Sequence, residues 1–279
     1  SRTKAIIPVD LAGIPVDYEQ IFSLVDSCRA VFKPSGKYQE ALGRIAVIAD
    51  AAHSFGASRG GIRSGSLADF SCFSFHAVKN LTTAEGGAVA WKSIPGIDDE
   101  EIYKNYMLLS LHGQTKDALN KNALGGWEYD IMLPGYKCNM TDMAAALGLS
   151  QLKRYESILA RRADLINFYN SAFQDSRIVP IRHFGDAYRS SGHLYITRIE
   201  GADEEERNKI INAMAAEGVS ANVHYKPLPM LTAYKNLGFD INNYPNAYNM
   251  YKNEITLPLN TVLTDEQAAR VSELLLHLV

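Results

Sequence analysis

The chain has 279 residues, of which 47% are hydrophobic and 21% charged, so it can build a substantial core and, at this length, two lobes. Its formal net charge is only −3 and no block of basic residues stands out, which gives no electrostatic reason to expect nucleic acid or a membrane surface as a partner. The three cysteines, Cys28, Cys72 and Cys138, show neither a disulfide framework nor a metal-ligand spacing, and no apolar run reaches the length of a membrane helix. We therefore expect a soluble, cytoplasmic protein that holds no metal and acts on a small metabolite.

Strands and helices alternate in the first half of the chain. A short, continuous apolar run, Ile45–Ala49, ends in Asp50, which is the pattern of a buried parallel strand with a polar residue at its carboxyl end. A glycine-rich loop over residues 56–65 follows it. Further strands are predicted over residues 5–9, 70–75 and 88–91, and a helix over residues 18–30. This alternation favours an α/β fold, in which ligands gather at the carboxyl edge of the sheet.

The second half of the chain begins with residues 98–126, which are polar and mixed in composition and are predicted to form a loop. Thr141 is expected to cap a helix over residues 143–152, and a second helix to continue to about Phe173. The remaining pattern predicts strands over residues 193–199 and 219–225, a helix over 202–217 closed by Gly218, and a final helix over 264–278. This part is therefore expected to be α+β.

One lysine follows the strand predicted over residues 70–75. The run Ser74-Phe75-His76-Ala77-Val78-Lys79 places it at the end of an apolar segment, and Thr83-Ala84-Glu85-Gly86-Gly87 follows closely. Taken alone, Lys79 is more simply a solvated surface charge and Asp50 a helix cap. Together at strand ends they match the needs of pyridoxal phosphate, whose aldehyde binds a lysine amine and whose ring nitrogen is kept protonated by a carboxylate. The pair predicts a transaminase.

Four ordered blocks of the sequence closely resemble the DegT/StrS-type sugar aminotransferases. They are Asp50-Ala51-Ala52-His53, Gly65-Ser66-Leu67-Ala68-Asp69, the run from Ser74 to Lys79, and Pro134-Gly135-Tyr136-Lys137-Cys138-Asn139-Met140-Thr141-Asp142. The resemblance extends over essentially the whole chain. It implies a fold type I enzyme: an incomplete, pyridoxal-phosphate-binding large domain with a mixed, mostly parallel sheet over residues 1–150, and a smaller α+β domain with linking helices over residues 151–279.

The resemblance also implies roles for individual residues. Lys79 would bind the cofactor covalently and act as base and acid, Asp50 would bond the ring nitrogen, and His53 would lie near the ring, although a structural histidine is an alternative there. Ser74 would bond the cofactor phosphate, and Asn139 would reach the same phosphate across a dimer interface, although Asn also favours turns. His193, His224 and Tyr136, with Trp127, are candidates to line the sugar site, with core packing as the alternative.

The expected reaction moves an amino group from glutamate to a nucleotide-linked sugar in polysaccharide or glycoconjugate biosynthesis, in a homodimer with shared active sites. The form of the sequence around Lys79 resembles the branch that aminates C4 of a 4-keto-sugar. The resemblance also implies that an amino-terminal segment of the family, ahead of the equivalent of Ser1, is missing here. Two alternatives remain: a sugar dehydratase of the same family, disfavoured because those enzymes have histidine at the position of Lys79, and a non-catalytic or regulatory protein that binds pyridoxal phosphate.

Overall fold

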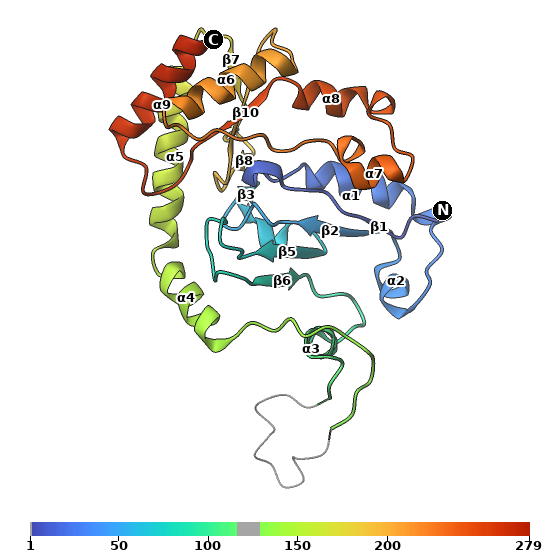
Figure 1. Ribbon diagram of the computed structural model, residues 1–279. Helices are drawn as coiled ribbons and strands as arrows, with labels where there is room; N and C mark the ends of the chain where they lie inside the picture. The colour runs from blue at the N-terminus through green and yellow to red at the C-terminus, as the bar shows by residue number, and fades with distance from the viewer. Residues whose placement is uncertain (1, 116–128) are drawn as a thin grey trace. The chain divides into compact units, whose positions relative to one another are not determined.

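The computed structural model describes residues 2–115 and 129–279 (Figure 1). The chain divides into two compact units, each built from segments that are discontinuous in sequence. The first unit comprises Ser1–Val9, Val16–Ala52 and Ser64–Lys153, and the second comprises Asp10–Pro15, His53–Arg63 and Arg154–Val279. No helix in the described part of the chain is long and apolar enough to cross a membrane.

The first unit is built on a four-stranded sheet with the order β1-β2-β5-β6 (Figure 1). The strands β1, β2 and β5 are parallel, and β6 is antiparallel to β5. This mixed, mostly parallel sheet, joined to helices, confirms the predicted α/β fold class. The strand bounds are β1 Ala5–Ile6, β2 Ala46–Asp50, β5 Phe70–Ser74 and β6 Gly87–Trp91.

A partly buried ion pair lies at the start of the two central strands. The Arg44 guanidinium, just before β2, donates to both carboxylate oxygens of Asp69, just before β5, at 2.7 Å each. The same carboxylate accepts the backbone N–H of Val47 within β2 at 2.9 Å. Since Asp69 is only 4% exposed and all three bonds are charge-assisted, this contact holds the two strands in one register.

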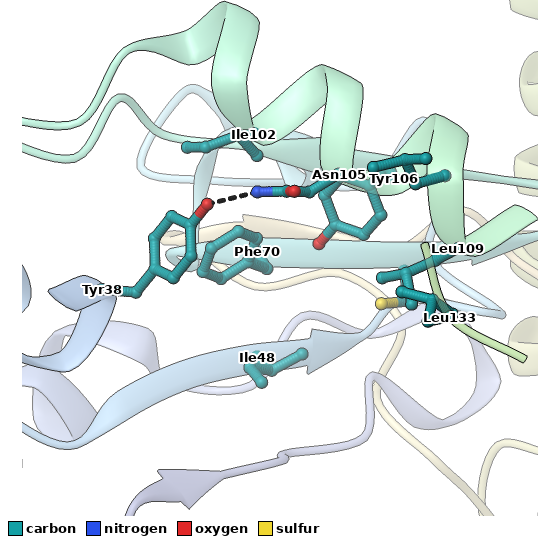
Figure 2. A pocket seen from close by; sticks show the side chains of 10 residues that line it. Tyr38, Ile48, Phe70, Ile102, Asn105, Tyr106, Leu109 and Leu133 are labelled. Atoms are coloured by element: carbon teal, nitrogen blue, oxygen red, sulfur yellow. Dashed lines mark hydrogen bonds between the residues drawn. The ribbon is translucent and has the colours of Figure 1, made fainter. Parts of the chain in front are cut away.

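The two faces of the sheet are covered differently. Helix α1 (Tyr18–Ser27) begins at Asp17, whose side chain accepts the N–H of Gln20, and buries Tyr18 and Val25. These two side chains belong to a core that also contains Val47 of β2. The opposite face of β2 and β5 is lined by residues that face helix α3 (Figure 2). The remaining helical elements of this unit are α2 Lys37–Leu42, α3 Asp99–Ser110, α4 Asp142–Leu152, and two short 3-10 turns at Arg29–Val31 and Ser64–Ser66.

Helix α3 corrects the prediction of a loop over residues 98–126. The side chain of Asp98 accepts the N–H of Glu100 and caps the helix, and three acidic residues follow in its first turn, where the helix dipole favours them. This acidic start made the segment look like a loop, although Ile102 is buried. Residues 116–128, including Trp127, lie outside the described residues.

The second unit has a core formed by helices on a three-stranded antiparallel sheet with the order β10-β9-β7. Helix α9 contacts α5 and α6, and it begins after Thr264, which forms a capping box with Gln267. A second sheet, β4-β3-β8, contains a hairpin within the predicted 56–65 loop. The elements of this unit are β3 Ser58–Arg59, β4 Ile62–Arg63, α5 Tyr155–Ala172, β7 Ile178–Pro180, β8 Tyr188–Arg189, β9 Tyr195–Ile199, α6 Glu204–Ala216, α7 Thr232–Asn236, α8 Pro245–Tyr251, β10 Glu254–Leu257, α9 Asp265–Leu278, and 3-10 turns at Leu11–Gly13, Leu228–Met230 and Ile241–Asn243.

The predicted strand over residues 219–225 is wrong. Only Asn222 pairs with a strand, through reciprocal backbone bonds to Thr256 of 3.0 and 2.7 Å. The next two backbone N–H groups donate to side-chain oxygens instead: Val223 to Asn222 Oδ1 and His224 to Glu254 Oε2. Because these donors are already satisfied locally, the segment does not continue as a strand.

Gly87, at the start of β6, offers a test of packing in the first unit. A Cβ at this position would lie 2.6 Å from the carbonyl oxygen of Phe73, whereas a Cβ at Gly36 would meet nothing within 4 Å. We expect Gly87→Ala to lower the free energy of unfolding by about 1–3 kcal/mol, because β5 and β6 must separate. The matched Gly36→Ala variant lies at the N-cap of α2 and should lower it by only about 0.5 kcal/mol. Urea unfolding measures both, and equal values for the two variants would contradict the close approach of these strands.

Candidate functional site

The carboxyl ends of β2 and β5 bring two candidate residues together. Ile48 pairs with Phe70 and Asp50 with Cys72, so Asp50, Cys72 and Ser74 continue the same face of the sheet. The carboxylate of Asp50 accepts the N–H of Ala52 at 3.2 Å. This carboxylate lies close enough to Lys79 to act on the pKa of its amine. The structure therefore places the Asp50 carboxylate within electrostatic reach of the Lys79 amine.

Lys79 is held on a compact loop between β5 and β6. Its N–H donates to the carbonyl of His76 at 2.9 Å, which closes a turn. The base of the loop is fixed because Phe75 donates to the Gly86 carbonyl and accepts from Thr83. Gln151 of α4 accepts the N–H of Thr82 at 3.1 Å and donates to its carbonyl. Strand, loop and helix together thus fix the position of the lysine backbone.

The surroundings of this edge change the protonation of its side chains. Desolvation lowers the pKa of the Lys79 amine, and the nearby Asp50 carboxylate opposes this effect. Apolar surroundings raise the pKa of the Cys72 thiol, and Asp50 adds to that effect. A lowered amine pKa increases the neutral fraction of Lys79, which is the form that attacks an aldehyde carbon.

A cavity of about 660 Å³ lies on the face of the sheet that leads to Asp50. Figure 2 shows it between α3 and the strands β2 and β5. Its polar groups include the Tyr38 hydroxyl, which accepts a hydrogen bond from Asn105 and donates to Glu101 at 2.7 Å. Its lining is otherwise mainly apolar and comprises Tyr38, Ile48, Phe70, Cys72, Ile102, Asn105, Tyr106, Leu108, Leu109 and Leu133.

Two predicted phosphate ligands, Ser74 and Asn139, lie in different local settings. The Ser74 hydroxyl accepts the N–H of His76 at 3.3 Å, beside the turn that contains Lys79. Asn139 is exposed, accepts a hydrogen bond from Lys137 and donates to the Met140 carbonyl. It borders a hollow of about 570 Å³ with the segment 83–87, and no hydrogen bond of the described residues joins it to Lys79 or Asp50.

A second cluster lies within the second unit and contains three predicted site histidines. The rings of His53 and His193 have centroids 4.3 Å apart, and the Tyr225 hydroxyl lies 3.5 Å from Nε2 of His53. The N–H of Ala12 donates to Nδ1 of His53 at 3.3 Å. Since Nδ1 accepts, the neutral His53 ring has its proton on Nε2, facing Tyr225.

Polar groups of neighbouring segments form hydrogen bonds with His193 and His224. The N–H of His193 donates to the Ala12 carbonyl at 3.0 Å, and Arg162 of α5 donates to the carbonyls of Gly192 and His193. Nδ1 of His224 lies 2.9 Å from the Thr256 hydroxyl, which donates to Glu254 at 2.6 Å. Both Glu254 and Thr256 belong to the buried strand β10.

The structure thus gathers the predicted residues in two clusters, Lys79, Asp50 and Ser74 in one and His53, His193 and His224 in the other. Tyr136, a predicted sugar ligand, is 86% exposed. Sequence reasoning missed Tyr225, Glu254 and Thr256. The only signal for Tyr225 was its place directly after His224, and Glu254 gave none, because it lies 30 residues from the histidine that it contacts.

The residues at the β2–β5 edge fit pyridoxal phosphate. A desolvated amine matches the aldehyde of the cofactor, a carboxylate matches its ring nitrogen, and a hydroxyl matches its phosphate. An α/β sheet with these groups at adjoining strand ends defines a pyridoxal-phosphate-dependent class of protein.

The chain belongs to the DegT/DnrJ/EryC1/StrS aminotransferase family, whose family model matches residues 1–276. This family uses pyridoxal phosphate. The relationship confirms the resemblance on which the sequence-based prediction rested.

Relatives with known names include a spore coat polysaccharide biosynthesis protein, SpsC of Bacillus subtilis, which is 36% identical over 98% of this chain and 66% of its own length. A UDP-4-amino-4,6-dideoxy-N-acetyl-beta-L-altrosamine transaminase of Campylobacter jejuni is 32% identical over 99% of this chain and 65% of its own length. The chain thus spans just under two thirds of the length of these relatives.

A solved structure, Spr1654 of Streptococcus pneumoniae, described as a sugar aminotransferase in its PMP form, has a TM-score of 0.95 at 57% identity. The match covers 99% of this chain and 69% of the Spr1654 chain. The same protein in its PLP form gives a TM-score of 0.94 at 55% identity, over 99% of this chain and 68% of that one. These structures share the fold of this chain and hold the two forms of the family's cofactor.

Cys72 reports on the charge of Asp50 without any cofactor. Because Asp50 raises the pKa of the Cys72 thiol, Asp50→Asn should lower it and increase the thiolate fraction. We expect alkylation of Cys72 near neutral pH to become about twofold faster. Peptide mass spectrometry resolves Cys72 from the exposed Cys138, which serves as the control in the same molecule. A Cys72 to Cys138 rate ratio that Asp50→Asn leaves unchanged would contradict this electrostatic contact.

Glu254 should make the stability of the second unit depend on pH. Burial raises its pKa from 4.5 to about 7, against the opposing effects of Thr256, the His224 N–H and Arg207. Because the folded state binds this proton more tightly, the stabilisation is fully present below about pH 4.5 and is lost as the pH rises through about 7. Between these limits we expect the unfolding free energy of the wild type to fall by up to roughly 3 kcal/mol more than that of Glu254→Gln.

Urea unfolding across this pH range measures the difference. The exposed Glu273 provides a matched control, because Glu273→Gln removes a carboxyl group without burial and should follow the wild type. If the unfolding free energies of the wild type and Glu254→Gln changed with pH in parallel, Glu254 would have the same pKa in the folded and unfolded states, which would contradict the prediction.

Proposed function

We propose that the protein is a pyridoxal-phosphate-dependent sugar aminotransferase that moves the amino group of glutamate to a nucleotide-linked 4-keto-sugar. The observation that supports this most directly is the position of the half-buried Lys79 on the loop after β5, within electrostatic reach of the Asp50 carboxylate. The named relatives add the substrate class, since one is a UDP-sugar transaminase and another serves polysaccharide biosynthesis. The product would enter a surface polysaccharide or glycoconjugate.

The residues of the β2–β5 edge divide the work. Pyridoxal phosphate, when bound, supplies an aldehyde that takes up an amino group and a ring that withdraws electrons from the bond broken at the donor carbon. Asp50 would keep the ring nitrogen protonated. Lys79 would hold the cofactor through a bond from Nζ to the aldehyde carbon, formed with loss of water. Once the amine of glutamate displaces it, the free Nζ would take the proton from the α carbon of glutamate and give it to the former aldehyde carbon. In the second half of the reaction the same amine moves a proton in the opposite direction.

We place Ser74 and Asn139 at the cofactor phosphate, with Asn139 contributed to the site of a partner subunit in a homodimer. Asn139 precedes α4, and that helix exposes large apolar side chains. Met143 is 80% exposed, Leu147 54% and Leu149 63%. Met143 and Leu147 are four residues apart and share one face of the helix, and an exposed apolar face of this kind favours a protein interface.

The sugar would lie against His193 and His224, with Tyr136 as a further ligand, while His53 would lie near the ring of the cofactor. Imidazole nitrogens, with one donor and one acceptor in the neutral ring, match the hydroxyl groups of a sugar. Amination at C4 is the preferred regiochemistry, on the resemblance of the sequence around Lys79 to the C4 branch.

The test uses the full-length purified protein with pyridoxal phosphate and glutamate. We expect a visible absorbance band from covalent attachment at Lys79, a change of that band with glutamate, and release of about one 2-oxoglutarate per site. Lys79→Ala should abolish the band and reduce turnover by about a thousandfold or more, because it removes both attachment and the base. Lys153→Ala, which removes an exposed lysine, is the matched control and should behave as the wild type.

Two results would contradict the proposal. Attachment at Lys79 without release of 2-oxoglutarate would indicate a protein that binds the cofactor but does not catalyse transamination. Loss of water from a nucleotide-linked sugar without transfer of nitrogen would indicate a dehydratase.

A further inference from the structure

A buried carboxyl group lies behind His224 in the second unit. Glu254 is 3% exposed on β10, a strand whose four residues are all buried. Its Oε2 accepts the backbone N–H of His224 at 2.9 Å, and its Oε1 accepts the hydroxyl of Thr256 at 2.6 Å. Burying a carboxylate is costly unless donors surround it, and here both oxygens have one.

The direction of these bonds determines the role of the Thr256 hydroxyl. A hydroxyl group has one proton to donate, and that proton points to the carboxylate of Glu254. In its 2.9 Å contact with Nδ1 of His224 the same oxygen must therefore act as the acceptor. The neutral His224 ring then has its proton on Nδ1, and Nε2 is its acceptor nitrogen.

We propose that Glu254 and Thr256 are positioning residues that fix the proton of His224 on Nδ1, so that Nε2 accepts a hydrogen bond from a hydroxyl group of the sugar substrate. The part that concerns the sugar rests on the proposed function, whereas the part that concerns the ring proton does not. The two parts are therefore tested by separate measurements.

In the variant Glu254→Gln, we expect the ring proton of His224 to lie on Nε2 instead of Nδ1. The His224 N–H can only donate, so the amide oxygen of the new glutamine must face it, and the amide NH₂ must face Thr256. The Thr256 hydroxyl then accepts from the amide and donates its own proton to Nδ1 of His224. The ring proton therefore moves to Nε2, with little change in the volume of the side chain.

The ring proton is observed by ¹⁵N NMR of the full-length protein labelled at its seven histidines, with His224→Gln to assign the signal. At about pH 8.5, where the Glu254 carboxyl is ionised, the wild type should show Nδ1 protonated. Glu254→Gln should show Nε2 protonated, and Thr256→Ser should retain the wild-type pattern because it keeps the hydroxyl.

Thr197→Val is the matched control, because Thr197 lies on the adjacent strand β9 and donates its hydroxyl to the Ile255 carbonyl at 2.8 Å. It removes a buried hydroxyl group from the same sheet, as Thr256→Val does, but should leave the His224 signal unchanged. Thr256→Val should mix the two forms of the ring. A wild-type ring protonated on Nε2, or a Glu254→Gln ring that keeps its proton on Nδ1, would overturn the proposal.

The role in sugar binding is tested by kinetics. In Glu254→Gln the sugar hydroxyl loses its acceptor on Nε2 and must turn its proton elsewhere, so we expect this variant to raise the KM for the nucleotide-sugar by about tenfold. The release of 2-oxoglutarate from glutamate should stay at the wild-type rate, a split that general destabilisation would not produce. An unchanged KM in a variant whose ring proton has moved would overturn the role in sugar binding. An inactive wild type would count against the proposed function, while the NMR result would still decide the position of the proton.

Discussion

The parallel pairing of β2 with β5 is the constraint on which the first cluster depends. Side chains alternate between the two faces of a strand, so a slip of one residue would turn Asp50 to the face that α1 covers. The ion pair of Arg44 with Asp69 opposes such a slip, because it joins the chain at the start of both strands and also binds the N–H of Val47 within β2. A contact at the amino edge of the sheet therefore determines which groups meet at its carboxyl edge.

The two clusters control protonation by different physical means. At the sheet edge, desolvation lowers the pKa of Lys79 and a single carboxylate opposes it, so the balance depends on burial and charge. In the histidine cluster, the direction of each hydrogen bond selects which ring nitrogen has the proton, as Ala12 does for His53 and Thr256 for His224. Burial and charge therefore set the neutral fraction of Lys79. Hydrogen-bond direction sets which ring nitrogen of each histidine has the lone pair.

The sequence was most informative where local pattern and tertiary structure agree. The apolar run that ends in Asp50 and the apolar segment before Lys79 are both parts of the sheet, and Thr141 caps α4 through the N–H of Ala144. The helix α3 was not predicted because its capping and first-turn residues are acidic, a composition that loops share. The nearness of Asp50 to Lys79 agrees with the expectation that ligand-binding groups gather at the carboxyl edge of the sheet.

The histidine cluster could be predicted only in part. The residues that support His224 lie on β10, a strand whose sequence does not show the usual apolar pattern. Strand β10 buries Glu254 and Thr256, and these polar residues interrupt the apolar pattern that marks a strand. The carboxylate of Glu254 takes the N–H of His224, and with that bond the expected strand over residues 219–225 cannot continue. The contact that ends this strand is the same contact that orients the histidine. The end of the expected strand at His224 therefore draws attention to Glu254 and Thr256, the residues that orient this histidine.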